Sequence, residues 1–231
     1  MTGQLKGDAM VRHIDNELQE LKDLILQMGG FVEKALDSAT AAILRFSPAD
    51  LETVQKFEEK INDLQIRIDE ACVNVLAKQA PVARDLRLVI AIVKINTDLE
   101  RMGDQAVNIG LVASDFPHGD RKVPQKIQSM SAEVKKIVRS ALDSFARQDI
   151  HLANQVLAQD DQIDQLKDDV ILENRTEMEK NSEMVEAGLG WITTAKNLER
   201  MADHATNIAE EVIYLMTGAD VRHGHALTAG S

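Results

Sequence analysis

The chain contains an internal repeat, and this feature restricts its fold more than any other. The segment Leu99–Ile109 (LERMGDQAVNI) returns 99 residues later as Leu198–Ile208 (LERMADHATNI), with eight of eleven positions identical. A weaker match joins Glu58–Leu64 to Asp160–Leu166 at an offset of 102 residues. Unrelated amphipathic helices rarely share Glu, Arg, Asp and Asn in one register, so the repeat predicts a duplicated structural unit.

The composition indicates that the repeated unit is helical. Among 231 residues there are only 4 Pro and 12 Gly, and aromatic residues make up 3% of the chain. Abundant Ala, Leu, Glu, Lys and Gln favour helices over strands. Breakers such as Pro48, Pro81 and Pro124 divide the chain into six long segments. We therefore predict an all-α fold of two tandem three-helix bundles related by internal duplication.

A turn signal at Phe116–Asp120 separates the two predicted bundles. We expect residues 1–117 to form the first three-helix repeat and residues 118–218 to form the second. Residues 219–231 contain little apolar material, so we expect a flexible tail there.

The second repeat carries its own helix start and stop signals. Asp149 is expected to cap a fifth helix that runs to Glu179. Ser182 is expected to start the sixth helix, and Gly218 to close it.

The charge of the chain excludes several classes of function. The formal net charge is −12, and nucleic acid is not expected as a ligand because phosphate backbones need a basic surface. The longest purely apolar run, Leu88–Val93, is far shorter than the roughly 20 residues that span a bilayer. The chain has no charged-then-apolar leader, and its single cysteine, Cys72, suits a reducing compartment. We therefore expect a cytoplasmic protein without membrane insertion.

The repeated segments place acidic residues at helical spacing. Residues four apart on an α-helix lie nearly above one another, roughly 6 Å apart along the axis. Glu100 and Asp104 therefore share one helix face, roughly opposite to an apolar face, and Glu199 and Asp203 repeat this pattern. The duplication thus predicts two equivalent acidic faces.

Two upstream pairs have the same four-residue spacing, and they allow a metal-binding hypothesis. If each pair faces the acidic pair of its own repeat, four oxygen-bearing side chains converge at each of two sites. Fe, Mn, Mg and Zn favour such ligands, and carboxylates can bridge several ions. The alternative is a solvated polar face without metal. The candidate ligands are Glu58, Asn62, Glu100 and Asp104 in the first repeat and Asp160, Asp164, Glu199 and Asp203 in the second.

Other conspicuous side chains have simpler interpretations. We expect Trp191 to anchor the core, Cys72 to be a buried thiol, and His204 to be exposed and non-ligating. His223 and His225 lie in the predicted tail, which is a poor place for a specific metal site. The sequence shows no Gly-rich phosphate loop, no Gly-x-Ser-x-Gly turn and no Cys/His zinc spacing.

The two repeated segments resemble the motif of the PhoU family, the phosphate-transport accessory and regulatory proteins of bacteria. That motif is an acidic residue, three other residues and then Asp. In this chain the pairs are Glu100 with Asp104 and Glu199 with Asp203. The stretch from Asp69 to Arg87 and the segment Val221–His223 are also similar to the family. The departures are small or apolar replacements at Met102, Met201 and Ala202.

The resemblance implies a cytoplasmic regulator without catalytic activity, built from two three-helix bundles and commonly assembled as a homodimer. Such proteins lower phosphate uptake and phosphate-starvation signalling. They act by contact with the ATPase subunit of the phosphate ABC transporter and with the phosphate-sensing histidine kinase. Family members can carry multinuclear metal clusters, often iron, on the acidic motifs.

Two alternatives come from other classes of protein. A di-iron carboxylate enzyme in a helical bundle requires Glu-x-x-His on two inward-facing helices. No Glu in this chain has a His three residues later, which disfavours that enzyme. The other alternative is a metal-free helical scaffold, and metal analysis of protein purified without chelator distinguishes it from a metalloprotein.

Overall fold

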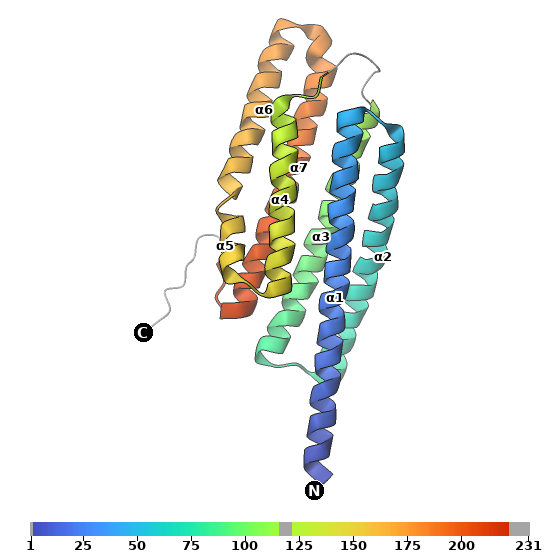
Figure 1. Cartoon of the computed structure of the whole chain (residues 1–231), viewed down its shortest axis with the longest axis vertical. Helices are drawn as coiled ribbons and strands as arrows, with labels where there is room; N and C mark the ends of the chain where they lie inside the picture. Colours follow the sequence, from blue (N-terminus) through green and yellow to red (C-terminus); the bar gives the residue numbers. More distant parts are fainter. Residues whose placement is uncertain (1, 116–121, 222–231) are drawn as a thin grey trace, which may run out of the picture.

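A computed structural model describes residues 2–115 and 122–221 of the chain, and within those ranges it contains helices and no strands. The helices are α1 (Thr2–Arg45), α2 (Pro48–Gln79), α3 (Ala83–Asp115), α4 (Gln125–Arg147), α5 (Ile150–Leu157), α6 (Asp160–Lys180), the short 3-10 helix η1 (Ser182–Met184) and α7 (Val185–Thr217). The all-α prediction is therefore confirmed (Figure 1). The predicted inter-repeat turn, the junction between residues 117 and 118, and the tail residues His223 and His225 lie outside the described residues.

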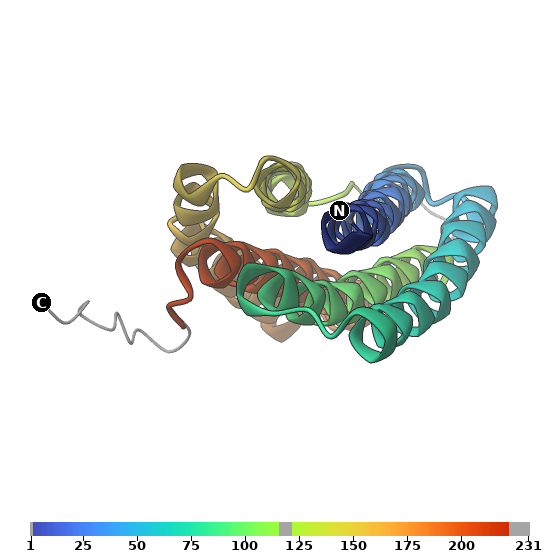
Figure 2. The ribbon, with the colours of Figure 1, turned by 90° about the horizontal axis from the view of Figure 1, so that it is seen from below.

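The helices form two groups, α1 to α3 and α4 to α7, which pack on each other through α3 and α7. In the first group α1, α2 and α3 contact one another, and in the second α4, α6 and α7 do so, with α5 packed on α4 and α7. Figure 2 shows α3 and α7 side by side at the centre, with α2 at one edge and α5 and α6 at the other. α1 and α4 lie together on one side of the α3–α7 pair (Figure 2).

The contact between α3 and α7, called the seam below, joins the two groups in antiparallel fashion. Its polar pairs are Lys94 with Glu211, Asp98 with His204 and Asp98 with Asn207. Residues late in α7 thus meet residues early in α3, and the midpoint of the pairing falls near Met102 and Met201. Because these two methionines are equivalent in the repeat, the antiparallel pairing relates the two repeated segments by an approximate half-turn.

The apolar faces of both repeated segments are buried in one continuous core. The buried residues include Leu99, Met102, Ala106 and Ile109 on α3, and Leu198, Met201, Ala205 and Ile208 on α7. Trp191 and Cys72 are also buried, as predicted, and burial raises the pKa of the Cys72 thiol to about 12. That thiol is therefore protonated at neutral pH and is not a reactive nucleophile.

Two glycines allow neighbouring helices to approach closely. A Cβ atom at Gly29 on α1 would lie 2.5 Å from Cδ2 of Leu142 on α4. A Cβ atom at Gly103 on α3 would lie 3.1 Å from Cδ1 of Ile61 on α2. The small residue inside the repeated motif therefore serves helix packing.

The fifth helix differs from the prediction of one helix between Asp149 and Glu179. α5 ends at Leu157, and α6 begins at Asp160 after a short break (Figure 1). Asp149 does cap α5, because its Oδ1 accepts hydrogen bonds from the backbone N–H groups of His151 (2.8 Å) and Leu152 (3.1 Å). The break puts Asp160 in the first turn of α6, where the helix dipole favours a negative charge.

The last helix begins slightly later than predicted and ends where predicted. Residues Ser182–Met184 form η1, and α7 starts at Val185. The side chain of Asn181 caps η1 by accepting a hydrogen bond of 3.0 Å from the backbone N–H of Glu183. Gly218 closes α7 with φ of 76°, a left-handed conformation that glycine adopts without strain.

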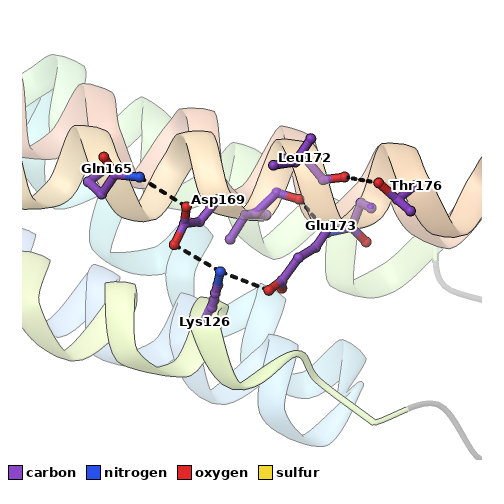
Figure 3. Close-up of polar contacts among 8 residues, drawn as sticks. Lys126, Gln165, Asp169, Leu172, Glu173 and Thr176 are labelled. Carbon is purple, nitrogen blue, oxygen red and sulfur yellow. Dashed lines mark hydrogen bonds and ion pairs between the residues drawn. The ribbon is translucent and has the colours of Figure 1, made fainter.

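An exposed ion-pair network joins α4 to α6 (Figure 3). The Lys126 ammonium lies 2.8 Å from Oδ2 of Asp169 and 2.7 Å from Oε1 of Glu173. The side-chain amide of Gln165 donates a further hydrogen bond of 3.0 Å to Asp169. Hydrogen bonds from Lys126 and Gln165 lower the pKa of the Asp169 carboxyl. Because the network is open to solvent, it contributes little to stability.

Candidate functional site: two acidic clusters

The first acidic cluster consists of Glu58 and Asn62 on α2 and Glu100 and Asp104 on α3. The side-chain amide of Asn62 donates a hydrogen bond to the Glu58 carboxylate. Partial burial, followed by the charges of Asp104 and Glu58, raises the pKa of Glu100, while the nearby Arg101 opposes this shift. The structure therefore brings together the four side chains that sequence spacing assigned to one site.

The first cluster contains an oxygen atom without a partner. Oδ1 of Asn62 is buried and accepts no hydrogen bond within the described part of the chain. A buried acceptor that loses its water partners without replacement is costly. This oxygen is accordingly a donor atom available to a cation.

The second acidic cluster consists of Asp160 and Asp164 on α6 and Glu199 and Asp203 on α7. Desolvation and the charges of Glu199, Asp160 and Asp164 raise the pKa of Asp203 to about 6. Desolvation and the charge of Asp164 also raise the pKa of Asp160. Because Asp203 remains exposed to solvent, screening limits the energetic cost of this crowding.

A lysine lies inside the second cluster, and sequence reasoning missed it. The Nζ atom of Lys167 lies 2.8 Å from Oδ1 of Asp164 and 3.1 Å from Oε1 of Glu199. The hydrogen bond to Asp164, with that to Glu199, raises the pKa of the Lys167 ammonium. One cation of the chain itself thus bridges carboxylates from α6 and α7.

Both clusters face away from the core and lie close to the seam. Glu100 and Glu199 are half-buried, whereas Asp104 and Asp203 are exposed. His204 on α7 is near enough to Glu100 on α3 to favour its charged form, so the first cluster adjoins α7. All eight candidate ligands come from α2, α3, α6 and α7, and none comes from α1 or α4.

The expectation that His204 is exposed is wrong. The side chain of His204 is only 13% exposed, and its Nδ1 lies 2.9 Å from Oδ1 of Asp98 across the seam. The side-chain amide of Asn207 donates a second hydrogen bond of 3.1 Å to the same oxygen. His204 is therefore a structural residue, and this contact becomes visible only once α3 and α7 are known to be antiparallel.

A polar cavity of about 330 Å³ also adjoins the seam, and no sequence pattern pointed to it. It is lined by Lys94, Thr97, Asp98, Arg101, Asn207, Glu210 and Glu211. Lys94 donates a hydrogen bond of 2.8 Å to Glu211, so one of the two cations that line the cavity is already paired. With three carboxylates against two cations, the cavity does not favour an anion such as phosphate.

The donor chemistry of the clusters fits a hard or intermediate cation. Carboxylate and carboxamide oxygens are the ligands such ions prefer, Oδ1 of Asn62 lacks a partner, and Lys167 places a positive charge between α6 and α7. No group of three or more His, Cys, Asp or Glu side chains in the described residues is arranged to hold a metal ion. Metal binding by the eight residues therefore stays a prediction.

Comparison with known protein families decides the relationship that the motif suggested. The family model of the PhoU domain matches the chain twice, over residues 25–113 and residues 127–212. The chain belongs to the PhoU family. Each match covers most of one group of helices, and the acidic pairs Glu100/Asp104 and Glu199/Asp203 fall inside the two PhoU matches.

Relatives of the chain are named for phosphate transport. It is 38% identical over 229 residues to a phosphate-specific transport system accessory protein PhoU homolog of Pseudomonas putida, covering 95% of this chain and 88% of that protein. It is 32% identical over 208 residues to the phosphate-specific transport system accessory protein PhoU of Escherichia coli, covering 90% of this chain and 86% of that one. These names describe accessory proteins of transport and do not describe enzymes.

Solved PhoU structures share the fold. The crystal structure of PhoU from Pseudomonas aeruginosa matches with a TM-score of 0.84 at 36% identity, over 89% of this chain and 99% of that chain. The phosphate transport system regulatory protein PhoU from Streptococcus pneumoniae matches with a TM-score of 0.84 at 28% identity, over 90% and 99% of the two chains. Among the described residues, no helix is long and apolar enough to cross a membrane.

Proposed function

We propose that this PhoU protein is a cytoplasmic negative regulator of phosphate uptake and of phosphate-starvation signalling. In this proposal it contacts the ATPase subunit of the phosphate ABC transporter and the phosphate-sensing histidine kinase. Its relatives are named phosphate-specific transport accessory proteins, which supports a role beside the transporter. The sequence lacks Glu-x-x-His and both acidic clusters face outward, so we propose no catalytic activity.

The outward placement of both family motifs supports docking as the mode of action. Asp104 and Asp203 are exposed on helices whose opposite faces are fully buried. Folding by itself gives weak reason for exposed acidic pairs, because surface charges contribute little stability. Contact of one partner protein with both clusters at once gives a reason for the duplication of the acidic pair.

We also propose that the acidic clusters bind metal, with a multinuclear iron cluster as the first candidate and Zn, Mn or Mg as alternatives. The oxygen donors and the unpartnered Oδ1 of Asn62 support this proposal. Clusters of carboxylates repel phosphate unless a cation lies between them. We therefore propose that the partner protein carries the phosphate signal through its own state. The face that bears the metal is then the docking surface.

Replacement of one acid in each cluster tests this proposal. The double variant D104N/D203N should lose bound metal and capture less transporter ATPase in a pull-down, with unchanged helicity by circular dichroism. The matched control E70Q/E177Q removes two exposed acids from α2 and α6 outside the clusters and should behave like the wild type. Undiminished ATPase capture by D104N/D203N would contradict the docking role.

We further propose that the protein is a homodimer. Large apolar side chains are exposed on neighbouring helices of the first group, Ile66 and Val73 on α2 and Ile90 and Val93 on α3. Large apolar side chains exposed on two helices that pack together support an interface with another chain. Light scattering should give a particle mass of twice the 25.6 kDa chain mass, and the Val93→Glu variant should give a lower particle mass.

A further inference from the structure

The duplication extends to the first helix of each group. At the repeat offset of 102 residues, the α1 segment 28–39 aligns with the α4 segment 130–141, and five of the twelve positions are identical. The apolar positions of both segments are buried in the core: Met28, Val32, Leu36 and Ala39 on α1, and Met130, Val134, Val138 and Ala141 on α4. The two helices therefore share the same packing face.

The charged positions beside this face have opposite signs in the two helices. Glu33 on α1 corresponds to Lys135 on α4, and Asp37 corresponds to Arg139. All four side chains line a cavity of about 250 Å³ between α1 and α4, together with Leu36, Lys136 and Val138. Two acids of the first repeat thus lie opposite two bases of the second.

The contacts across this cavity follow the half-turn that relates the repeats. Nζ of Lys135 lies 2.7 Å from Oδ1 of Asp37, and the half-turn converts this pair into Arg139 with Glu33. Partial burial raises the pKa of Glu33, and the charge of Arg139 is the largest influence that lowers it. The charges of Asp143 and Asp37 raise the same pKa, each by less. Each acid of α1 therefore meets the base that corresponds to the other acid.

Two repeats with identical charges would repel each other at this contact. If α4 carried the acids of α1, a carboxylate would lie opposite Asp37 in place of the Lys135 ammonium. Like charges at contact distance oppose association and so discriminate between partners. The apolar positions cannot discriminate, because they are apolar in both repeats. Only the charges distinguish an unlike repeat from a like one.

From these observations we propose that α1 and α4 form a charge-selective pairing surface between the two repeats. The surface of α1 accepts a first helix that carries opposite charges and rejects one that carries its own. The first repeat therefore pairs with the second, whereas the first repeats of two copies of the chain repel each other at this surface. The inference is independent of the metal binding and docking proposed above.

Charge reversal on either helix tests the selection directly. K135E/R139D gives α4 the charges of α1. E33K/D37R gives α1 the charges of α4, so each double variant gathers four like charges at the contact. In dilute buffer the Tm of each should fall by about 2–4 °C, because solvent partly screens the pairs. The quadruple variant restores opposite charges and should unfold within about 1 °C of the wild type.

A matched control and a salt series separate this selection from a general effect of charge. E59K/E70R reverses two exposed acids of α2 and changes the net charge of the chain as much as E33K/D37R does. It should leave the Tm within about 1 °C of the wild type. The losses in the two double variants should disappear at about 1 M salt, where the Debye length is about 3 Å.

The quadruple variant distinguishes charge selection from damage to the packing. A lower Tm in both double variants, with recovery in the quadruple variant, supports the inference. If the quadruple variant loses as much as the double variants, the native side chains matter rather than their charges, and the inference is wrong. An unchanged Tm in both double variants would also overturn it, because like charges would then be tolerated at this contact.

Discussion

The seam and the acidic clusters occupy neighbouring faces of the same two helices, and they use polar residues in different ways. In the seam, Asp98 is buried and its charge is met by His204 and Asn207 from the other repeat. In the clusters, Asp104 and Asp203 are exposed and lie among like charges. A polar group that serves folding is thus paired and buried, whereas one available for binding is crowded and open.

This difference predicts opposite responses to mutation. Changes at the seam and the core beneath it should cost stability, because buried groups lose packing or hydrogen bonds. Changes in the clusters should leave the fold intact, or stabilise it, while removing metal and partner binding. Such a trade between stability and activity is common at functional sites.

The largest effect is expected at the midpoint of the repeat pairing. Met201→Ala removes a fully buried side chain, and we expect it to lower the free energy of unfolding by about 2–5 kcal/mol. Leu189→Ala on the same helix is the control, because Leu189 is exposed and should change stability by less than about 0.5 kcal/mol. Urea unfolding of both variants measures the contrast, and similar values for the two would show that the core does not dominate α7.

The next effect is expected at the polar pairs of the seam. Asp98→Ala leaves His204 and Asn207 without their shared acceptor, and it should destabilise the fold by about 1–3 kcal/mol. His204→Ala should cost less in the Asp98→Ala background than in the wild type, because the contact is already absent. Additive losses in a double-mutant cycle would argue that the two residues do not interact.

A smaller effect of opposite sign is expected in the second cluster. The pKa of Asp203 is raised to about 6 in the folded protein, above the usual 3.8, so the folded state binds this proton more tightly. The wild type should therefore lose stability as the pH rises from about 4 to 6. The Asp203→Asn variant has no carboxyl at this position and so does not lose stability in this way. In the absence of metal and above pH 6, its free energy of unfolding should exceed that of the wild type by about 1 kcal/mol, a value reduced for solvent screening.

Thermal unfolding in chelator at pH 4 and pH 7 measures the Asp203 effect. The stabilisation should be small at pH 4, where the carboxyl is protonated in the folded state and partly protonated in the unfolded state, and full at pH 7. Excess Mn²⁺ should reverse the order of stability, because only the wild type keeps the ligand. Equal stability of the two proteins at both pH values in chelator would mean that Asp203 is not crowded by its neighbours.

The smallest effect is expected at the exposed network between α4 and α6 (Figure 3). Lys126→Met removes the ion pairs with Asp169 and Glu173, which solvent already screens. The Tm should fall slightly in dilute buffer, and the difference should vanish at about 1 M salt, where the Debye length is about 3 Å. A large loss of stability that persists in high salt would mean that this network, like the seam, contributes strongly to the stability of the fold.

Local signals in the sequence predicted the helices and their ends. Asp149 was identified as a cap and Gly218 as a stop because each acts on its own backbone. The acidic pairs of α3 and α7 could be assigned to one face from four-residue spacing alone. The break between Leu157 and Asp160 was not predicted, and nothing in the structure explains why α2 lacks a similar break.

The partners across helices could not be predicted in the same way. Lys167 follows Asp164 by three residues, a spacing that is typical of an ordinary surface ion pair within one helix. Its contact with Glu199 depends on how α6 packs against α7. His204 was misjudged for a similar reason, since Asp98 belongs to the other repeat and reaches it only across the seam.

The sequence by itself determined the helices, the duplication and the family, because these follow from periodicity, capping residues and a motif repeated in register. Only the tertiary structure decided which charges meet. Packing of α3 against α7 buries Asp98 with His204, and packing of α6 against α7 brings Lys167 to Glu199. The energy of a charge depends on its neighbours within a few ångströms and on its exposure, and a linear sequence specifies neither.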